Sequence, residues 1–109
     1  MRIIKDGKIE YKQEYKGSNS DGSVALTNAN TWYAVPSGTA PTVPYILIVS
    51  LENIAGTIRF SFDNGGTPST TNGNIAPEQL AIEMAANTVL YYGSSVAGDD
   101  VNFTIKNKY

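Results

Sequence analysis

The sequence predicts an all-β protein, an antiparallel β-sandwich of jelly-roll or immunoglobulin-like type with an extended N-terminal arm. Two observations predict this class. Short apolar segments are separated by clusters of Gly, Pro, Asn, Ser and Thr, which favour turns over helices. Three of these segments, within residues 57–62, 79–84 and 101–107, alternate apolar and polar side chains with the period of two that is typical of strands.

The 109 residues are enough for one folded domain and not two. Residues 17–23 consist of Gly, Ser, Asn and Asp, a composition typical of a flexible linker. We therefore assign residues 1–22 to an N-terminal arm and linker, and residues 23–109 to the sandwich domain.

The arm differs from the rest of the chain in pattern and charge. Asp6-Gly7 is a hairpin-turn signal, and it lies between the apolar pair Ile3-Ile4 and Ile9. Residues 1–16 hold five basic and three acidic residues, whereas the remainder holds three basic and seven acidic residues. This asymmetry suggests a separate piece of chain that pairs with an acidic surface, although an ordinary soluble tail has the same composition.

Within the arm, apolar side chains spaced by polar ones suit a strand that lies on a partner. The residues expected to bind a partner are Ile9, Tyr11, Lys12, Tyr15 and Lys16. No other residues are assigned to a site.

Strands of the sandwich are expected near residues 24–27, 31–35, 44–52, 57–62, 79–84, 88–93 and 101–107. Pro77 could begin a helical turn, but the alternation from Leu80 to Met84 favours a strand. The expected core residues are Leu47, Val49, Ile58, Phe60, Leu80, Ile82, Val101, Phe103 and Ile105. Replacing the core residue Phe60 with alanine should cost about 3–5 kcal/mol.

The segment from Tyr45 to Val49 is apolar at every position. Such a run predicts a central strand that is covered on both faces. A loop of the same domain or another subunit could provide the outer cover.

The composition excludes several classes of function. The chain contains no cysteine and no histidine, so it has neither disulfides nor the commonest catalytic base and zinc ligand. Adjacent Asp99 and Asp100 would point to opposite faces of a strand, so they cannot form an acid–base pair. We expect no catalytic residues, no metal and no cofactor. The net charge of −2 argues against binding to nucleic acid, and no apolar run is long enough to span a membrane.

Two polar or aromatic features have alternative interpretations. Asp63-Asn64-Gly65 could offer oxygen ligands to calcium, but it is also a common turn sequence. The neighbours Trp32-Tyr33 and Tyr91-Tyr92 should each place one ring outward. Those rings could cap the core, lie in a protein interface or stack on a sugar.

The order of strands and turns from Asn30 to Lys106 resembles that of small virion proteins of tailed bacteriophages. The matching stretches are Asn30-Thr31-Trp32-Tyr33-Ala34-Val35-Pro36, Ile48-Val49-Ser50-Leu51-Glu52-Asn53, Gly56-Thr57-Ile58-Arg59-Phe60-Ser61-Phe62-Asp63, Ile75-Ala76-Pro77-Glu78 and Val89-Leu90-Tyr91-Tyr92-Gly93-Ser94-Ser95. Such proteins resemble β-sandwiches that decorate capsids or build neck and tail parts. The resemblance carries no functional residue onto this chain.

The resemblance implies a non-enzymatic structural protein of a phage particle, either a capsid decoration protein or a neck or tail component. Its expected partners are the major capsid protein or neck and tail proteins, together with further copies of itself. The start of the chain lacks the apolar stretch of a signal peptide, so we expect synthesis in the host bacterial cytoplasm and a final location in the virion. The alternative function is a stand-alone ligand-binding sandwich, with carbohydrate as the ligand.

Overall fold

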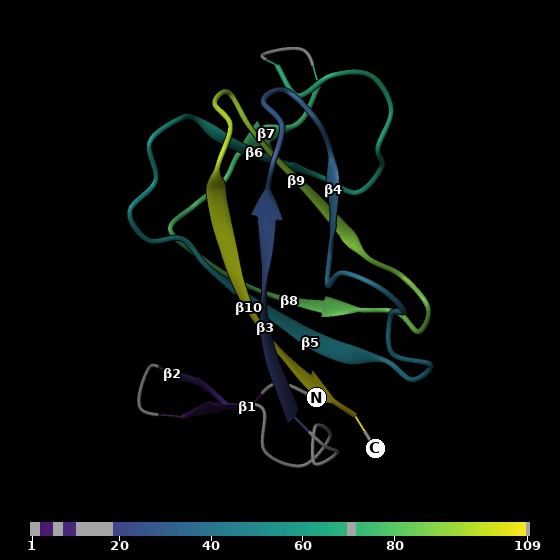
Figure 1. Cartoon of the computed structure of the whole chain (residues 1–109). Coiled ribbons are helices and arrows are strands. Elements are labelled where there is room, and N and C mark those ends of the chain that lie inside the picture. Colours follow the sequence, from purple (N-terminus) through teal and green to yellow (C-terminus); the bar gives the residue numbers. More distant parts are fainter. Residues whose placement is uncertain (1–2, 6–7, 11–18, 70–71, 109) are drawn as a thin grey trace.

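Two four-stranded antiparallel sheets face each other in the computed structural model, which describes residues 3–5, 8–10, 19–69 and 72–108 (Figure 1). The first sheet contains β3 (Asn19–Leu26), β5 (Tyr45–Ser50), β8 (Gln79–Met84) and β10 (Asp99–Asn107). The second contains β4 (Tyr33–Val35), β6 (Ile58–Ser61), β7 (Asn74–Ile75) and β9 (Leu90–Ser94). No described residue is helical, and the predicted all-β sandwich is therefore confirmed.

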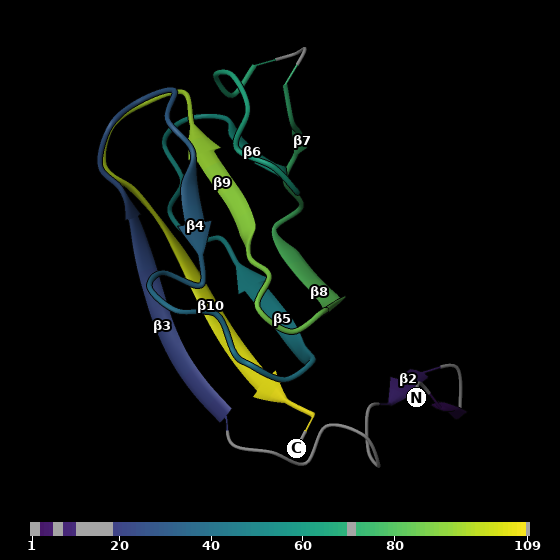
Figure 2. The same ribbon diagram turned by 90° about the vertical axis from the view of Figure 1, so that its right-hand side faces the viewer.

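The strand order is that of a jelly roll. The first sheet runs β3-β10-β5-β8 and the second β4-β9-β6-β7, so the first strand of the sandwich pairs with the last, the second with the next to last, and so on inward (Figure 2). The chain thus behaves as one long antiparallel pair wound into two layers, which is the jelly-roll connectivity and not the immunoglobulin one.

The core lies between the two layers. It is built by inward-facing side chains of seven strands, with Tyr45, Leu47, Val49, Leu90, Tyr92 and Val101 among the fully buried residues. Five of the nine expected core residues are buried, namely Leu47, Val49, Ile58, Val101 and Ile105. The other four, Phe60, Leu80, Ile82 and Phe103, are half-buried and pack against that core. Leu80 and Ile82 lie on β8, at a margin of the first sheet where no further described strand pairs with it.

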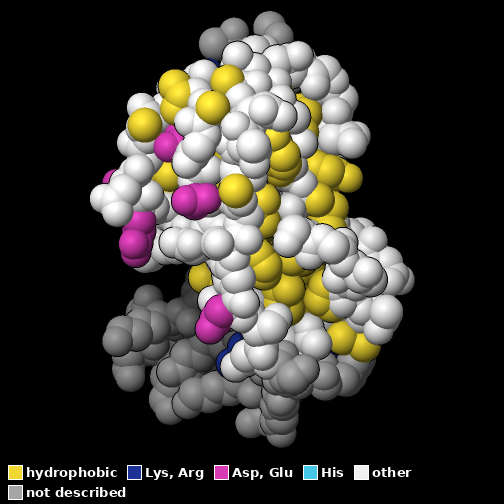
Figure 3. Space-filling model, in the orientation of Figure 1, with side chains coloured by type: hydrophobic (Ala, Val, Ile, Leu, Met, Phe, Trp, Pro, Cys, Tyr) yellow, Lys and Arg dark blue, Asp and Glu magenta, His cyan; other side chains and the backbone are white. Residues whose placement is uncertain are grey.

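One such margin is visible where the edge strands of the two sheets meet. In the space-filling view, hydrophobic side chains appear in a hollow between β3 and β4 (Figure 3). Both strands are outermost in their sheets, so no further strand covers the core on this side. A domain of this size buries only part of its apolar surface, so some apolar side chains stay exposed at such a margin.

The apolar strand β5 is central, as predicted, and it lies between β10 and β8. Its inward residues are fully buried, and Ile46 on the outer face is also buried, with 2% of its surface exposed. Ile48, the next outward residue, is 39% exposed. The prediction of cover on both faces therefore holds at Ile46 and fails at Ile48.

The start of the sandwich differs from the sequence analysis. Residues 19–23, expected in a flexible linker, form the first part of β3 and pair with residues 102–106 of β10. Cross-strand pairing outweighs the weak strand propensity of Ser, Asn and Gly, since the neighbouring strand β10 is long and regular. The expected boundary between residues 22 and 23 thus falls inside a strand.

The short strand β7 was not expected. Its two residues pair with Arg59 and Phe60 of β6, and they lie between the expected strands 57–62 and 79–84, where no strand was expected. A two-residue strand has no detectable period, so sequence pattern could not reveal it. The strand β8 has the predicted alternation, and the helical alternative at Pro77 is wrong.

A separate hairpin precedes the sandwich. β1 (Ile3–Lys5) and β2 (Lys8–Glu10) pair antiparallel with Ile4 opposite Ile9, as the Asp6-Gly7 signal predicted. No helix capable of crossing a membrane occurs among the residues that the structure describes.

Candidate functional site

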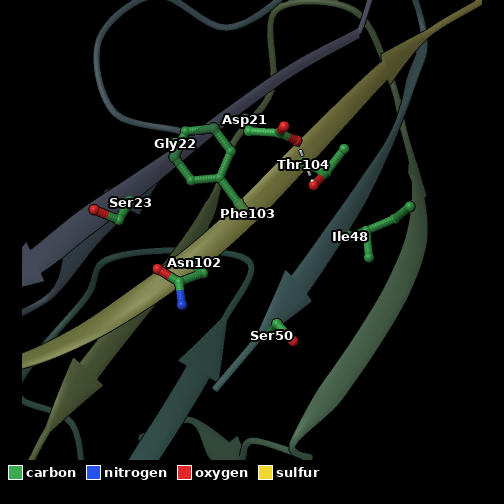
Figure 4. Close-up of a pocket in the computed structure, with 8 residues that line it drawn as sticks. All are labelled: Asp21, Gly22, Ser23, Ile48, Ser50, Asn102, Phe103 and Thr104. Atoms are coloured by element: carbon green, nitrogen blue, oxygen red, sulfur yellow. Dashed lines mark hydrogen bonds between the residues drawn. The ribbon is translucent and has the colours of Figure 1, made fainter. Parts of the chain in front are cut away.

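A surface depression lies on the outer face of the first sheet (Figure 4). The strand register aligns two rows of outward side chains across β3, β10 and β5: Asp21, Thr104 and Ile48 form one row, and Ser23, Asn102 and Ser50 form the other. Together they line a shallow groove of about 550 Å³, which we call the outer groove.

The polar groups of the outer groove are mostly available for a ligand. Thr104 Oγ1 donates a 2.7 Å hydrogen bond to Asp21 Oδ1, which links β3 to β10. The side chains of Ser23, Ser50 and Asn102 make no hydrogen bond to another described residue. The groove thus presents hydroxyl and amide groups that can donate and accept hydrogen bonds.

The groove contains one exposed apolar contact, Ile48, and one carboxylate, Asp21. It holds no second titratable group that could complete an acid–base pair. Among the described residues there is no cluster of three potential metal ligands. The groove therefore offers hydrogen-bonding groups, one carboxylate and one exposed aliphatic side chain.

The wall of the groove on β3 depends on a glycine. Gly22 lies opposite Phe103 in the register, and the Phe103 ring lies across it (Figure 4). A Cβ at position 22 would be only 2.6 Å from Phe103 Cζ. Aromatic cover of a glycine in an edge strand stabilises a position that has no side chain of its own.

A second polar cluster is buried at the end of β10 nearest β9. Asp99 accepts hydrogen bonds from Ala55 N at 2.9 Å, Gly56 N at 3.0 Å and the buried Ser94 Oγ at 2.7 Å. Burial alone would raise the pKa of Asp99, but the hydrogen bonds from Ala55, Ser94 and Gly56 outweigh it and hold the pKa below its usual value. The carboxylate is therefore ionised at neutral pH and holds the loop before β6.

The two adjacent aspartates face opposite ways, as predicted. Asp99 is 5% exposed, whereas Asp100 lies on the exposed outer face of β10. Their separation excludes a shared catalytic function and leaves Asp99 with a structural role.

The calcium alternative at Asp63 receives no support from the local geometry. Asp63 Oδ1 accepts a 3.0 Å hydrogen bond from Gly65 N, and Asp63 N donates to Ser61 Oγ at 3.2 Å. The carboxylate therefore closes the turn that its sequence also predicted.

The aromatic pairs belong mainly to the sandwich itself. Tyr92 is fully buried and Tyr33 packs against the core. Their neighbours Tyr91 and Trp32 are half-buried on the other side, and Trp32 Nε1 donates a 3.3 Å hydrogen bond to Gly65 O. The outward Trp32 ring is therefore covered in part by the loop after β6, which supports the interpretation that these rings cap the fold.

The predicted partner-binding residues of the arm are only partly within the structure. Ile9 lies in β2, opposite Ile4, and nothing is described of its side chain. Tyr11, Lys12, Tyr15 and Lys16 lie outside the described residues. The assignment of these five residues to a partner-binding site therefore stays a prediction.

Sequence reasoning missed two of the six outward side chains of the outer groove. It recognised Asn102 and Thr104 as the polar face of a strand, but it placed Asp21 and Ser23 in a linker. The alternation of Asp21, Ser23 and Ala25 with Gly22 and Val24 was the available signal, and it is weak because only one of those residues is a strong strand former.

Comparisons with known proteins add no assignment: no family model, no curated protein and no solved structure matches the chain. The structure by itself shows a jelly-roll sandwich, and the resemblance to phage virion proteins stays a prediction.

Proposed function

We propose that this chain is a non-enzymatic structural protein of a phage particle, a capsid decoration protein or a neck or tail component. It acts through protein–protein contacts. The observation that carries the proposal is the outer groove, a polar contact surface with one exposed isoleucine and no convergent titratable groups, on a jelly-roll fold.

The fold is compatible with the proposal but does not select it among other functions. Jelly rolls occur in viral capsid proteins, and they also occur in lectins and enzymes. The groove narrows the choice because its six outward side chains offer hydrogen bonds and one apolar contact across three strands, the kind of mixed chemistry that protein interfaces use.

The arm would provide a second contact. Its excess of basic residues complements an acidic partner surface, and its alternating apolar residues suit addition to an exposed sheet edge. Attachment of many identical copies at symmetric positions requires such repeated, non-covalent contacts.

The first experiment locates the protein. Antibodies raised against the purified chain would be applied to phage particles from the source strain, separated on a density gradient and viewed by immunogold electron microscopy. We expect the chain to co-migrate with particles and label the capsid, neck or tail. Recovery only in the soluble fraction would contradict the proposal.

The second experiment tests the groove. Ile48→Asn removes the exposed apolar contact on the β5 side of the outer groove, and Ile75→Asn is its matched control because Ile75 is 59% exposed on the other sheet. We expect Ile48→Asn to reduce binding to particles that lack the protein and Ile75→Asn to leave binding unchanged. Equal binding by both variants would exclude the outer groove as the docking surface.

The alternative is a carbohydrate-binding module, and one feature favours it. Asp21, Ser23, Ser50, Asn102 and Thr104 offer the hydroxyl, amide and carboxylate groups that bind sugar hydroxyls. Deleting residues 1–16 separates the two functions, because sugar binding measured on a glycan array should survive the deletion whereas particle attachment should fall.

A further inference from the structure

A smaller pocket lies on the opposite layer of the sandwich. It has a volume of about 360 Å³ and is lined by Asn30, Thr57, Arg59, Pro68, Ser69 and Ser95. Arg59 belongs to β6, where its neighbours across the sheet are Gly93 and Ile75. We call this depression the Arg59 pocket.

The walls of the Arg59 pocket are held by specific contacts. Pro68 is buried against Gly93, where a Cβ would be only 2.5 Å from Pro68 Cγ. Asn30 N donates to Ser94 O at 2.7 Å, and this bond ties the loop before β4 to β9. The pocket is therefore pre-formed, since its two sides are anchored on the same central strand.

The opposite wall is equally fixed. Ser95 N donates to Thr57 O at 3.1 Å, and Thr57 N donates to Ser95 Oγ at 2.9 Å. Because Ser95 Oγ accepts from the backbone, its own hydroxyl hydrogen is available to a ligand. The Thr57 hydroxyl and the Asn30 amide make no hydrogen bond to another described residue.

Arg59 has no counter-ion within the described structure. No aspartate or glutamate lines the pocket, and no described residue forms an ion pair or hydrogen bond with the guanidinium group. From residue 19 onward the described chain has seven acidic and three basic residues, so acidic partners are plentiful. Arg59 is half-buried and has no acidic counter-ion among the described residues, so its five N–H donors are available to a ligand.

We propose that the Arg59 pocket binds a carboxylate group, supplied either by an acidic residue of a partner protein or by an acidic sugar. The planar fork of a guanidinium group matches a carboxylate with two parallel hydrogen bonds. The other donors are neutral, and the single positive charge therefore balances one carboxylate better than a doubly charged phosphate. This site is on a different face from the outer groove and does not depend on the proposed phage function.

The test is a titration of the ¹⁵N-labelled full-length chain followed by NMR at constant ionic strength. The ligands are glucuronate with glucose as its uncharged control, and N-acetyl-glutamate amide with N-acetyl-glutamine amide as its control. The observed signals are the Arg59 side-chain N–H and the backbone amides of Thr57 and Ser95. We expect saturable shifts with the carboxylates and none with their uncharged counterparts.

Variants then assign the binding to the guanidinium group. Arg59→Gln should weaken binding by at least about tenfold, as expected for loss of a charged hydrogen-bonding partner, and Arg59→Lys should weaken it less. Lys106→Gln is the matched control because Lys106 lies on β10 in the other sheet, and it should bind as the wild type does. If Arg59→Gln does not fold, the wild-type titration and Arg59→Lys still decide the question.

Some outcomes of the titration identify the source of the carboxylate, and others decide whether the site exists. Binding of glucuronate alone identifies an acidic sugar, binding of the glutamate derivative alone identifies a protein ligand, and equal binding supports the carboxylate site without further selectivity. Shifts that sodium chloride reproduces, or that persist in Arg59→Gln, would overturn the proposal. So would the absence of saturable shifts with either carboxylate.

Discussion

At the scale of single residues, stability depends on a few buried polar groups whose bonding is well defined. Asp99 is the clearest case, because one carboxylate accepts two backbone N–H groups and one hydroxyl. A buried acceptor of this kind orders a loop that has no strand of its own.

Asp99→Asn should destabilise the protein by about 1–3 kcal/mol, because one carboxylate oxygen is replaced by an NH₂ group that faces backbone donors. Asp100→Asn is the control, since Asp100 is exposed, and it should change stability by less than about 0.5 kcal/mol. Urea unfolding at pH 7 measures both. Equal effects would show that the Asp99 hydrogen bonds contribute nothing.

The same carboxylate gives the wild type an acid-sensitive component. Its pKa in the folded state is lower than in the unfolded state, so its contribution is complete above the usual value of 3.8 and is lost as pH falls through the lower folded value. The Asp99→Asn variant should therefore lose less stability than the wild type as the pH falls below 3.8, which urea unfolding at a series of acidic pH values measures.

Two buried tyrosines form a natural comparison. Tyr45 Oη donates a hydrogen bond to Thr88 O, whereas Tyr92 Oη is buried with no hydrogen-bond partner among the described residues. Tyr45→Phe should cost about 1 kcal/mol, and Tyr92→Phe should be neutral or stabilising, because it removes an unsatisfied hydroxyl group. Thermal and urea unfolding decide; a larger loss for Tyr92→Phe would point to a partner for its hydroxyl group.

Burial raises the pKa of Tyr45 to about 12 and that of Tyr92 further still. Both side chains therefore favour the folded state fully below pH 10, and this contribution is lost as pH rises from the unfolded value towards the folded ones.

At the scale of elements, neighbouring strands decide which side chains carry packing energy. On β3, a glycine is required where the Phe103 ring of β10 crosses it. On β6, the alternation of apolar and polar residues determines which side chains face the core. The position of the strand in the sheet determines how deeply each side chain is buried.

Gly22→Ala should destabilise the sandwich by about 1–3 kcal/mol, because the new methyl group would overlap the Phe103 ring. In a Phe103→Ala background the same change should cost much less, since the two sites are in direct contact. A double-mutant cycle from urea unfolding gives the coupling. Additive effects would mean that the ring does not occupy this space.

Phe60→Ala should cost about 2–3 kcal/mol, less than the 3–5 kcal/mol expected of a fully buried ring, because Phe60 is only half-buried. Part of the loss comes from its stacking on Tyr92, with ring centroids 6.0 Å apart. Phe62→Ala is the control: Phe62 is 65% exposed and should matter far less. Similar losses for both would refute this ranking.

At the scale of the whole molecule, the boundary of the sandwich decides what can be removed. β3 begins at Asn19, so the arm that can be deleted without cutting a strand ends before it. This corrects the boundary expected from the Gly- and Ser-rich composition.

Deleting residues 1–16 should change the melting temperature by no more than about 2 °C while reducing attachment to particles. Deleting residues 1–23 should lower the melting temperature strongly, because it removes five residues of β3 that pair with β10. Differential scanning calorimetry compares the two deletions. A collapse after the shorter deletion would show that the arm is part of the sandwich.

The sequence by itself determined the class of fold, because a period of two in β6, β8 and β10 and the punctuation between them are local properties. It also identified β5 as central, since its apolar run has no polar face. The pairing of β1 with β2 was also predicted from a local signal, the Asp6-Gly7 dipeptide in the sequence.

Only the tertiary structure decided the jelly-roll order, the membership of residues 19–23 in β3, and both surface pockets. The outer groove joins β3, β5 and β10, and the Arg59 pocket joins segments from residue 30 to residue 95. Such sites have no signature along the chain, because they arise when strands distant in sequence are brought side by side by hydrogen bonds and by burial of their shared inner face.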